Sequence, residues 1–172
     1  LTVSATETID KAKYDALDLL TDGTVTFTKI EDTYDNLNNM GSTLAGKTVT
    51  VSDAMTIAEL GNIQTHVGGS GSITYTISDT VSVLTGLTAN SGSTHTDLTG
   101  ATTVTINNAT TIAQIGTIKA LNGTTTPEYT TINDTAAILG ANNADTSALM
   151  TSKTIVLNTN ATAAQYRQAL TN

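Results

Sequence analysis

One sixteen-residue pattern occurs twice in this chain and limits what the chain can fold into. Residues 48–63 read TVTVSDAMTIAELGNI, and residues 103–118 read TVTINNATTIAQIGTI. The apolar residues Val49, Val51, Ile57, Leu60 and Ile63 meet Val104, Ile106, Ile112, Ile115 and Ile118 at one constant offset. Self-similarity at a fixed period is typical of architectures in which repeated units stack on one another.

A shorter repeat lies inside the long one. Residues 75–87, YTISDTVSVLTGL, again show an alternating strand, then Ser-Asp, then an apolar helical run. The residue at this strand-to-helix junction recurs once per shorter repeat, as Ala5, Asp32, Asp53, Asp79, Asn108, Asp134 and Asn160. The intervals of roughly 21–29 residues are in the range of repeat architectures and predict about seven coils.

Each coil is predicted to hold a strand, a junction and a helix. The strand alternates apolar and polar residues with period 2, and the helix places its apolar residues on one stripe. Returns rich in Gly, Asn, Ser and Thr close the coils. Because strand, helix and parallel strand connect in a right-handed sense in nearly all cases, we expect a right-handed β/α solenoid. It would have a parallel sheet on one side and helices on the other.

The N-terminal region is predicted to carry the strongest helix, over residues 6–20. Its apolar side would hold Ile9, Ala12, Ala16, Leu19 and Leu20. We expect residues 1–172 to form a single solenoid segment. The chain starts in a predicted strand and stops after a predicted helix without polar end caps, as a segment cut from a longer protein would.

The composition argues against two classes of partner. The formal net charge is −8, and residues 48–172 contain only three basic residues, Lys119, Lys153 and Arg167. Binding to nucleic acid needs a basic stripe, which this pattern lacks. No apolar run approaches a membrane span, so membrane insertion is not expected. The absence of cysteine suits a protein exported from a bacterial cell.

The acidic junction residues have two interpretations. Asp53, Asp79 and Asp134 recur at the same place in successive coils, and stacked carboxylates are oxygen ligands that calcium accepts. Alternatively, each is an N-cap for the helix that follows it. Asn108 and Asn160 stand at the same position, and this exchange favours caps over a calcium site.

Threonine makes up 39 of the 172 residues and is concentrated on the polar face of the predicted strands. This face is predicted to present ranks of hydroxyl and methyl groups, and its members are Thr48, Thr50, Thr74, Thr76, Thr103 and Thr105. Such ranks on one face resemble those of ice-binding proteins. They also suit lateral packing between chains or binding to surface carbohydrate.

No constellation of catalytic residues stands out. No serine lies in a G-x-S-x-G nucleophile elbow, and the two histidines lack partners at metal-ligand spacing, apart from Asp97 beside His95. The glycine run at residues 68–71 precedes a strand, whereas a phosphate-binding loop precedes a helix. We therefore expect a protein that is not an enzyme.

Three segments together resemble the repeats of very large secreted bacterial surface proteins. They are ITYTISDTVSVLTGL at residues 73–87, TTVTINNATTIAQIGTIKAL at residues 102–121 and TTINDTAAILG at residues 130–140. The resemblance is to S-layer-like, adhesin-like and hemolysin-type calcium-binding proteins of cyanobacteria and proteobacteria. It implies an extracellular or cell-surface location, often with calcium. The glycine-aspartate nonapeptide of many such proteins is missing, since residues 68–72 lack the aspartate.

These observations lead to two functional hypotheses. The first is a structural repeat segment of a surface-layer or adhesin-type protein, which serves as a stiff spacer or self-associates with neighbouring repeats. The second is a binding module that uses the threonine face against carbohydrate, another cell surface or ice.

Overall fold

The computed structural model describes residues 2–141 and 144–171, and it has a mixed α/β fold of parallel strands and helices with no closed barrel. The chain divides into two compact units. Unit 1 comprises residues 1–77 and 100–102, and unit 2 comprises residues 78–99 and 103–172.

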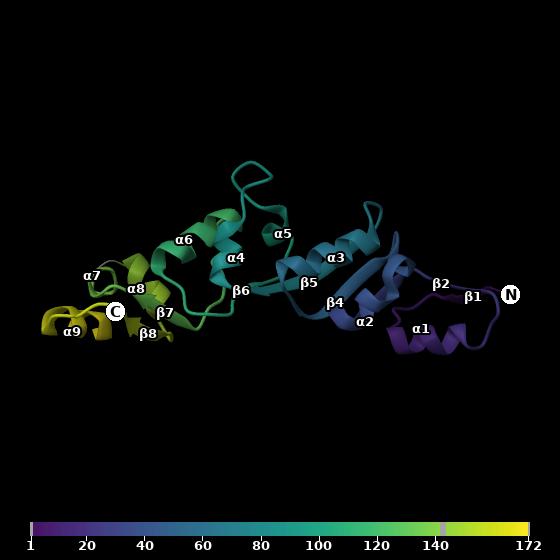
Figure 1. Cartoon of the computed structure of the whole chain (residues 1–172), viewed down its shortest axis with the longest axis horizontal. Helices are drawn as coiled ribbons and strands as arrows, with labels where there is room; N and C mark the ends of the chain where they lie inside the picture. The colour runs from purple at the N-terminus through teal and green to yellow at the C-terminus, as the bar shows by residue number, and fades with distance from the viewer. Residues whose placement is uncertain (1, 142–143, 172) are drawn as a thin grey trace. The chain divides into compact units, whose positions relative to one another are not determined.

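Unit 1 alternates strands and helices along the chain. Its elements are β1 (Thr2–Ala5), α1 (Lys11–Asp18), β2 (Thr24–Phe27), β3 (Lys29–Asp32), α2 (Tyr34–Met40), the short 3₁₀ helix η1 (Gly41–Leu44), β4 (Thr48–Met55), α3 (Ile57–Val67) and β5 (Ser72–Asp79), whose last two residues belong to unit 2. Helices α2 and α3 contact each other and β4 (Figure 1).

Unit 2 contains shorter strands and more helices. Its elements are α4 (Val81–Gly86), α5 (Thr96–Thr99), β6 (Val104–Ile106), α6 (Ile112–Leu121), β7 (Thr131–Asp134), α7 (Ala136–Leu139), α8 (Ala144–Met150), β8 (Thr154–Leu157) and α9 (Ala163–Thr171). Helices α4 and α6 lie side by side, and α7 contacts α9 (Figure 1). The sequence interpretation had assigned neither α5 nor α8.

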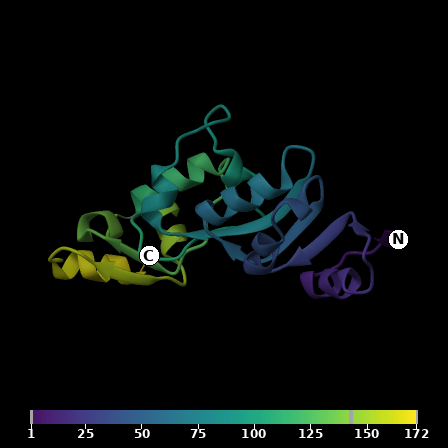
Figure 2. The same ribbon diagram turned by 45° about the vertical axis from the view of Figure 1, so that its right-hand side comes forward.

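The strand pairs β1–β2, β3–β4, β4–β5 and β7–β8 are parallel, as predicted. In the described part of the chain, however, the strands form separate sheets with the orders β1-β2, β3-β4-β5-β6 and β7-β8. The first break falls at Thr28, where β2 pairs back with β1 and β3 pairs onward with β4 (Figure 2). One continuous sheet with seven coils is therefore not confirmed.

The repeated segments bury the same face, as the helical spacing predicts. Leu60 and Ile63 of α3 are fully buried, and so are their repeat partners Ile115 and Ile118 of α6. Ile57 and Ile112, one turn earlier, are half-buried. Burial of one aliphatic side chain stabilises a fold by roughly 1.5–3 kcal/mol, so each of these positions contributes to the stability of its unit.

The prediction of a helix over residues 6–20 is wrong at both ends. Ile9 lies in extended chain and bridges Ile30, with its N–H donating to Lys29 O at 3.2 Å, and it is buried there. Helix α1 begins only at Lys11, after the N-cap Asp10. At the other end Leu19 and Leu20 are 89% and 77% exposed instead of lying on a packed stripe.

Gly71 is required by the close approach of two segments of unit 1. A Cβ atom at this position would lie 2.3 Å from Val67 Cγ1 and 2.6 Å from Lys47 O. We predict that Gly71→Ala lowers the free energy of unfolding by about 1–3 kcal/mol, as overpacking does. Denaturant unfolding followed by circular dichroism measures this change.

Gly61, inside α3, provides the control for Gly71. A Cβ there meets nothing within 4 Å, so Gly61→Ala should be neutral or should stabilise the fold by up to roughly 1 kcal/mol. Equal unfolding free energies for the two variants would contradict the close contact at Gly71.

Candidate functional site

Side chains at the ends of strands cap the helices of preceding segments in unit 1. Asp32, the last residue of β3, accepts a hydrogen bond from the Lys11 N–H through Oδ2 at 2.9 Å, and Lys11 is the first residue of α1. Asp53 Oδ1 accepts from the Tyr34 N–H, the first residue of α2, at 2.7 Å. A helix leaves its first amides without partners, so each contact satisfies a group that would otherwise need water.

The same contact recurs in unit 2 with three kinds of side chain. Asn108 Oδ1 accepts from the Val81 N–H of α4 at 2.8 Å, and Asp134 Oδ2 accepts from the Ile112 N–H of α6 at 3.0 Å. Thr159 Oγ1 accepts from the Ala136 N–H of α7 at 3.1 Å. In each case the acceptor lies 22 to 27 residues after its donor, about one predicted coil further along the chain.

These contacts correct the predicted direction of capping. The sequence predicts that Asp53 and Asp134 cap the helices that follow them, but in the structure they cap the helices that come before. The physical reason is geometric: in a parallel arrangement the end of each strand lies beside the N-terminus of the preceding helix. Asp79 is buried, and its Oδ1 accepts from the Thr80 N–H at 2.7 Å.

Threonine performs the local capping. Thr56, Thr80, Thr111 and Thr135 are the N-cap residues of α3, α4, α6 and α7, and each hydroxyl accepts from an amide three residues on. Thr56 with Glu59, and Thr111 with Gln114, form reciprocal capping boxes. The sequence shows this capping-box signal as T-I-A-E and T-I-A-Q. The interpretation of the junction aspartates as caps does not use it.

Asp32 shows how much the junction depends on hydrogen bonds. Burial alone would raise the pKa of its carboxyl group. The Asn36 side chain and the amides of Lys11 and Thr33 all donate to the charged form, and together with the Lys11 charge they lower the pKa below 3.8. The ionised carboxylate is therefore the form that the fold selects.

The calcium prediction for Asp53, Asp79 and Asp134 remains a prediction. Across residues 2–141 and 144–171 no group of three or more His, Cys, Asp or Glu side chains is placed to hold a metal ion. Both carboxylate oxygens of Asp134 already accept backbone N–H groups, from Ile112 and Thr135. A cation at Asp134 would have to compete with these bonds.

The threonine face is only partly assembled as predicted. Thr48 lies opposite Ser72, with 3.3 Å between their hydroxyl oxygens, and Thr50 lies opposite Thr74. After Thr50 the register of β4 shifts, so Thr76 lies opposite Ala54. Thr48 and Thr74 are exposed, whereas Thr50, Thr76, Thr103 and Thr105 are half-buried. Thr103 precedes β6, and Thr105, inside β6, bridges Glu128.

The register shift lies at one place within β4. β4 contains three residues, Val51, Ser52 and Asp53, between two paired segments. Such an irregularity re-aims the strand, and here it brings the Asp53 carboxylate to the Tyr34 N–H. The alternation of apolar and polar residues alone does not reveal it.

Comparison with known proteins identifies no relative: no family model, no curated protein and no solved structure matches the chain. Among the described residues, no helix has both the length and the apolar character that crossing a membrane requires.

Asp134 offers a direct test of the capping contacts. We predict that Asp134→Ala lowers the free energy of unfolding by about 2 kcal/mol, because two partly buried amides, of Ile112 and Thr135, lose their acceptor. Asp134→Asn keeps one acceptor oxygen and should lose less. Denaturant unfolding measures both changes, and hydrogen exchange at Ile112 locates them.

The control for Asp134 is Asp22→Ala, a change to an exposed aspartate in the turn after α1. It should alter stability by less than about 0.5 kcal/mol. Unchanged exchange at Ile112 in Asp134→Ala would count against the contact.

Asp32 should make part of the stability depend on acid pH. A carboxyl group whose folded pKa is depressed stabilises the fold above its unfolded pKa, here 3.8, and this contribution is lost as pH falls through the folded value. We predict that the wild type is more stable than Asp32→Asn at pH of about 6, and that the difference shrinks below pH 3.8. Urea unfolding at a series of pH values measures it. A difference that stays constant over this range would contradict the prediction.

Proposed function

We propose that this chain is a structural repeat segment of an extracellular bacterial surface protein of the surface-layer or adhesin type, without enzymatic activity. Its strand-helix segments form a right-handed β/α solenoid of about seven coils, each of roughly 21–29 residues. The segment serves as a stiff spacer and associates with copies of itself or with neighbouring repeats.

The observation that carries this proposal is the recurring capping contact. The donors Lys11, Tyr34, Val81, Ile112 and Ala136 are each the first residue of a helix, and each finds its acceptor one segment later. A contact that links one segment to the next suits a stack that grows by adding equivalent units. A structural role of this kind requires no reactive side chain in the interior of the fold.

The composition supports the role in association. Many exposed strand residues of unit 1 are short and hydroxylated, among them the adjacent pair Thr48 and Ser72. Threonine favours the extended conformation and keeps such a face stiff without making it apolar. Contacts between hydroxylated faces of this kind are polar and hydrated.

A second function is binding through the same face, to surface carbohydrate or to ice. Two neighbouring hydroxyl positions on β4 and β5, Thr50 and Thr74, favour it, because they lie directly opposite each other. The shift that places Thr76 opposite Ala54 shortens this rank, which makes the structural role the better supported of the two.

The test is negative-stain electron microscopy of the purified chain, with calcium and then with a chelator. We predict ordered sheets or filaments, and we predict that Thr48→Lys combined with Thr74→Lys prevents them. Charged side chains on this face would repel each other in a lateral contact. If chelation dissolves the assemblies, calcium becomes part of the proposal, with Asp53, Asp79 and Asp134 as its candidate ligands.

Matched control substitutions lie on the helical side. Thr65→Lys on α3 and Thr117→Lys on α6 add the same charges at exposed positions away from the strands. They should leave assembly unchanged. Dispersed particles under every condition would contradict self-association, and binding of the wild type alone to polysaccharide or ice would favour the second function.

A further inference from the structure

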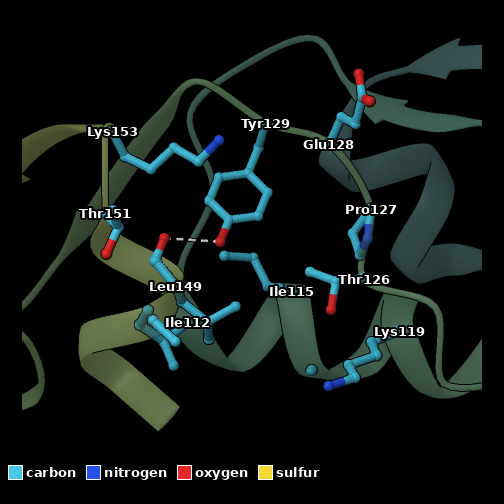
Figure 3. A pocket seen from close by; sticks show the side chains of 12 residues that line it. Ile112, Ile115, Lys119, Thr126, Pro127, Glu128, Tyr129, Leu149, Thr151 and Lys153 are labelled. Carbon is cyan, nitrogen blue, oxygen red and sulfur yellow. Dashed lines mark hydrogen bonds between the residues drawn. The ribbon is translucent and has the colours of Figure 1, made fainter. Parts of the chain in front are cut away.

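A cavity of about 690 Å³ lies in unit 2, between α6, the extended segment around Tyr129 and the region from α8 to Lys153 (Figure 3). Binding sites for small molecules commonly have volumes of roughly 300–1,000 Å³. Neither the capping contacts nor the threonine face uses this cavity, so it needs an explanation of its own.

The lining of the cavity combines an apolar part with polar side chains. Ile112 and Ile115 come from α6, Pro127 from the extended segment and Leu149 from α8. Tyr129 stands among them, and its hydroxyl donates to Leu149 O at 2.8 Å, which ties the segment to α8. Burial raises the pKa of Tyr129, so the phenol stays protonated and keeps this hydrogen bond. The wall is therefore held in place by contacts within the unit.

The charges around the cavity are unusual for this chain. Residues 48–172 contain only three basic residues, and two of them, Lys119 and Lys153, line the cavity. Figure 3 shows them on opposite sides, with Ile115 and Tyr129 between them. The Lys153 ammonium lies over the Tyr129 ring, 4.7 Å from its centroid. Glu128 is the acidic residue of the lining, and its carboxylate points away from Ile115 in this view.

Gly116 leaves the cavity open along one side of α6. It lines the cavity, and a Cβ atom at this position would meet nothing within 4 Å. Its repeat partner in α3, Gly61, is also helical and also has open space around it. The chain therefore supplies a pair of equivalent glycines, of which one borders the cavity and the other lies in unit 1.

We propose that this cavity binds a small organic carboxylate with an apolar body, such as a medium-chain fatty acid. The apolar body would pack on Ile112, Ile115 and Leu149, and the carboxylate would pair with the ammonium group of Lys153 or Lys119. The lining holds two ammonium groups, of Lys119 and Lys153, against one carboxylate, of Glu128, and this local excess of positive charge favours an anion over a cationic ligand.

The first experiment titrates the full chain, labelled with ¹⁵N, with sodium octanoate and follows the amide signals by NMR. We expect saturable shifts at Gly116 and Thr126, with a dissociation constant on the order of 1 mM for a ligand of this size. Octanamide, which has the same chain without the charge, should bind at least about three-fold more weakly. Shifts that are absent, or equal for both compounds, would overturn the proposal.

Charge variants test which lysines take part. Lys119→Gln combined with Lys153→Gln should weaken octanoate binding by about three- to ten-fold, since two partly exposed charges are removed. Lys47→Gln is the matched control, because Lys47 also lies over an aromatic ring, that of Phe27 in unit 1. Equal affinities for the double variant and the control would overturn the assignment of the anion site.

The glycine pair tests the location without disturbing the fold. Gly116→Leu fills the cavity from a position with free space, and leucine favours helix over glycine, so the variant should fold. It should reduce octanoate binding by at least about ten-fold, whereas Gly61→Leu should leave binding unchanged. Wild-type binding by Gly116→Leu would show that octanoate binds elsewhere and would overturn the proposal.

Discussion

The fold depends on a hydrogen bond between a side chain at the end of one strand and the first amide of the preceding helix. Asp32, Asp53, Asn108, Asp134 and Thr159 all provide such an acceptor. A short helix has few internal bonds to offset its unpaired N-terminal amides, and α4 and α7 have only six and four residues. Such helices gain an acceptor from the next segment, so the stability of each segment is coupled to that of its neighbour.

The sequence predicted the parts of the fold that follow from the periodic spacing of apolar residues. The apolar stripe of α3 and α6 is buried, and the strands pair in parallel, because helical and strand periodicities leave a clear trace in the order of apolar residues. It did not predict where α1 begins, since Ile9 fits a helical stripe but pairs with Ile30 as extended chain. The partner Ile30, which comes from another segment, decides whether Ile9 joins a helix or a strand. The spacing of apolar residues around Ile9 does not reveal this partner.

The sequence indicated which residue types stand at the candidate site, but it did not indicate how they are arranged. The sequence favoured the junction aspartates as helix caps, and Asp53 and Asp134 accept from the first amides of helices. The direction in which they cap depends on how segments stack, which a single repeat does not encode. The break in the threonine rank comes from the shifted register of β4, because Ala54 lies opposite Thr76 where an unshifted register would place Ser52. The cavity had no sequence signal, because Lys119 and Lys153 are distant in the sequence and come to one cavity only through the fold.

The stacking of segments rests on one segment capping the helix of another. The most direct measurement is NMR detection of scalar couplings through hydrogen bonds, from the amide nitrogen of Ile112 to the side-chain carboxylate carbon of Asp134, and equally from Val81 to Asn108. The account predicts a coupling for both pairs, since the donor-acceptor distances are 3.0 and 2.8 Å. If these two amides showed no such coupling and exchanged with solvent as fast as exposed amides, the segments would not be linked in this way and the stacked account would be wrong.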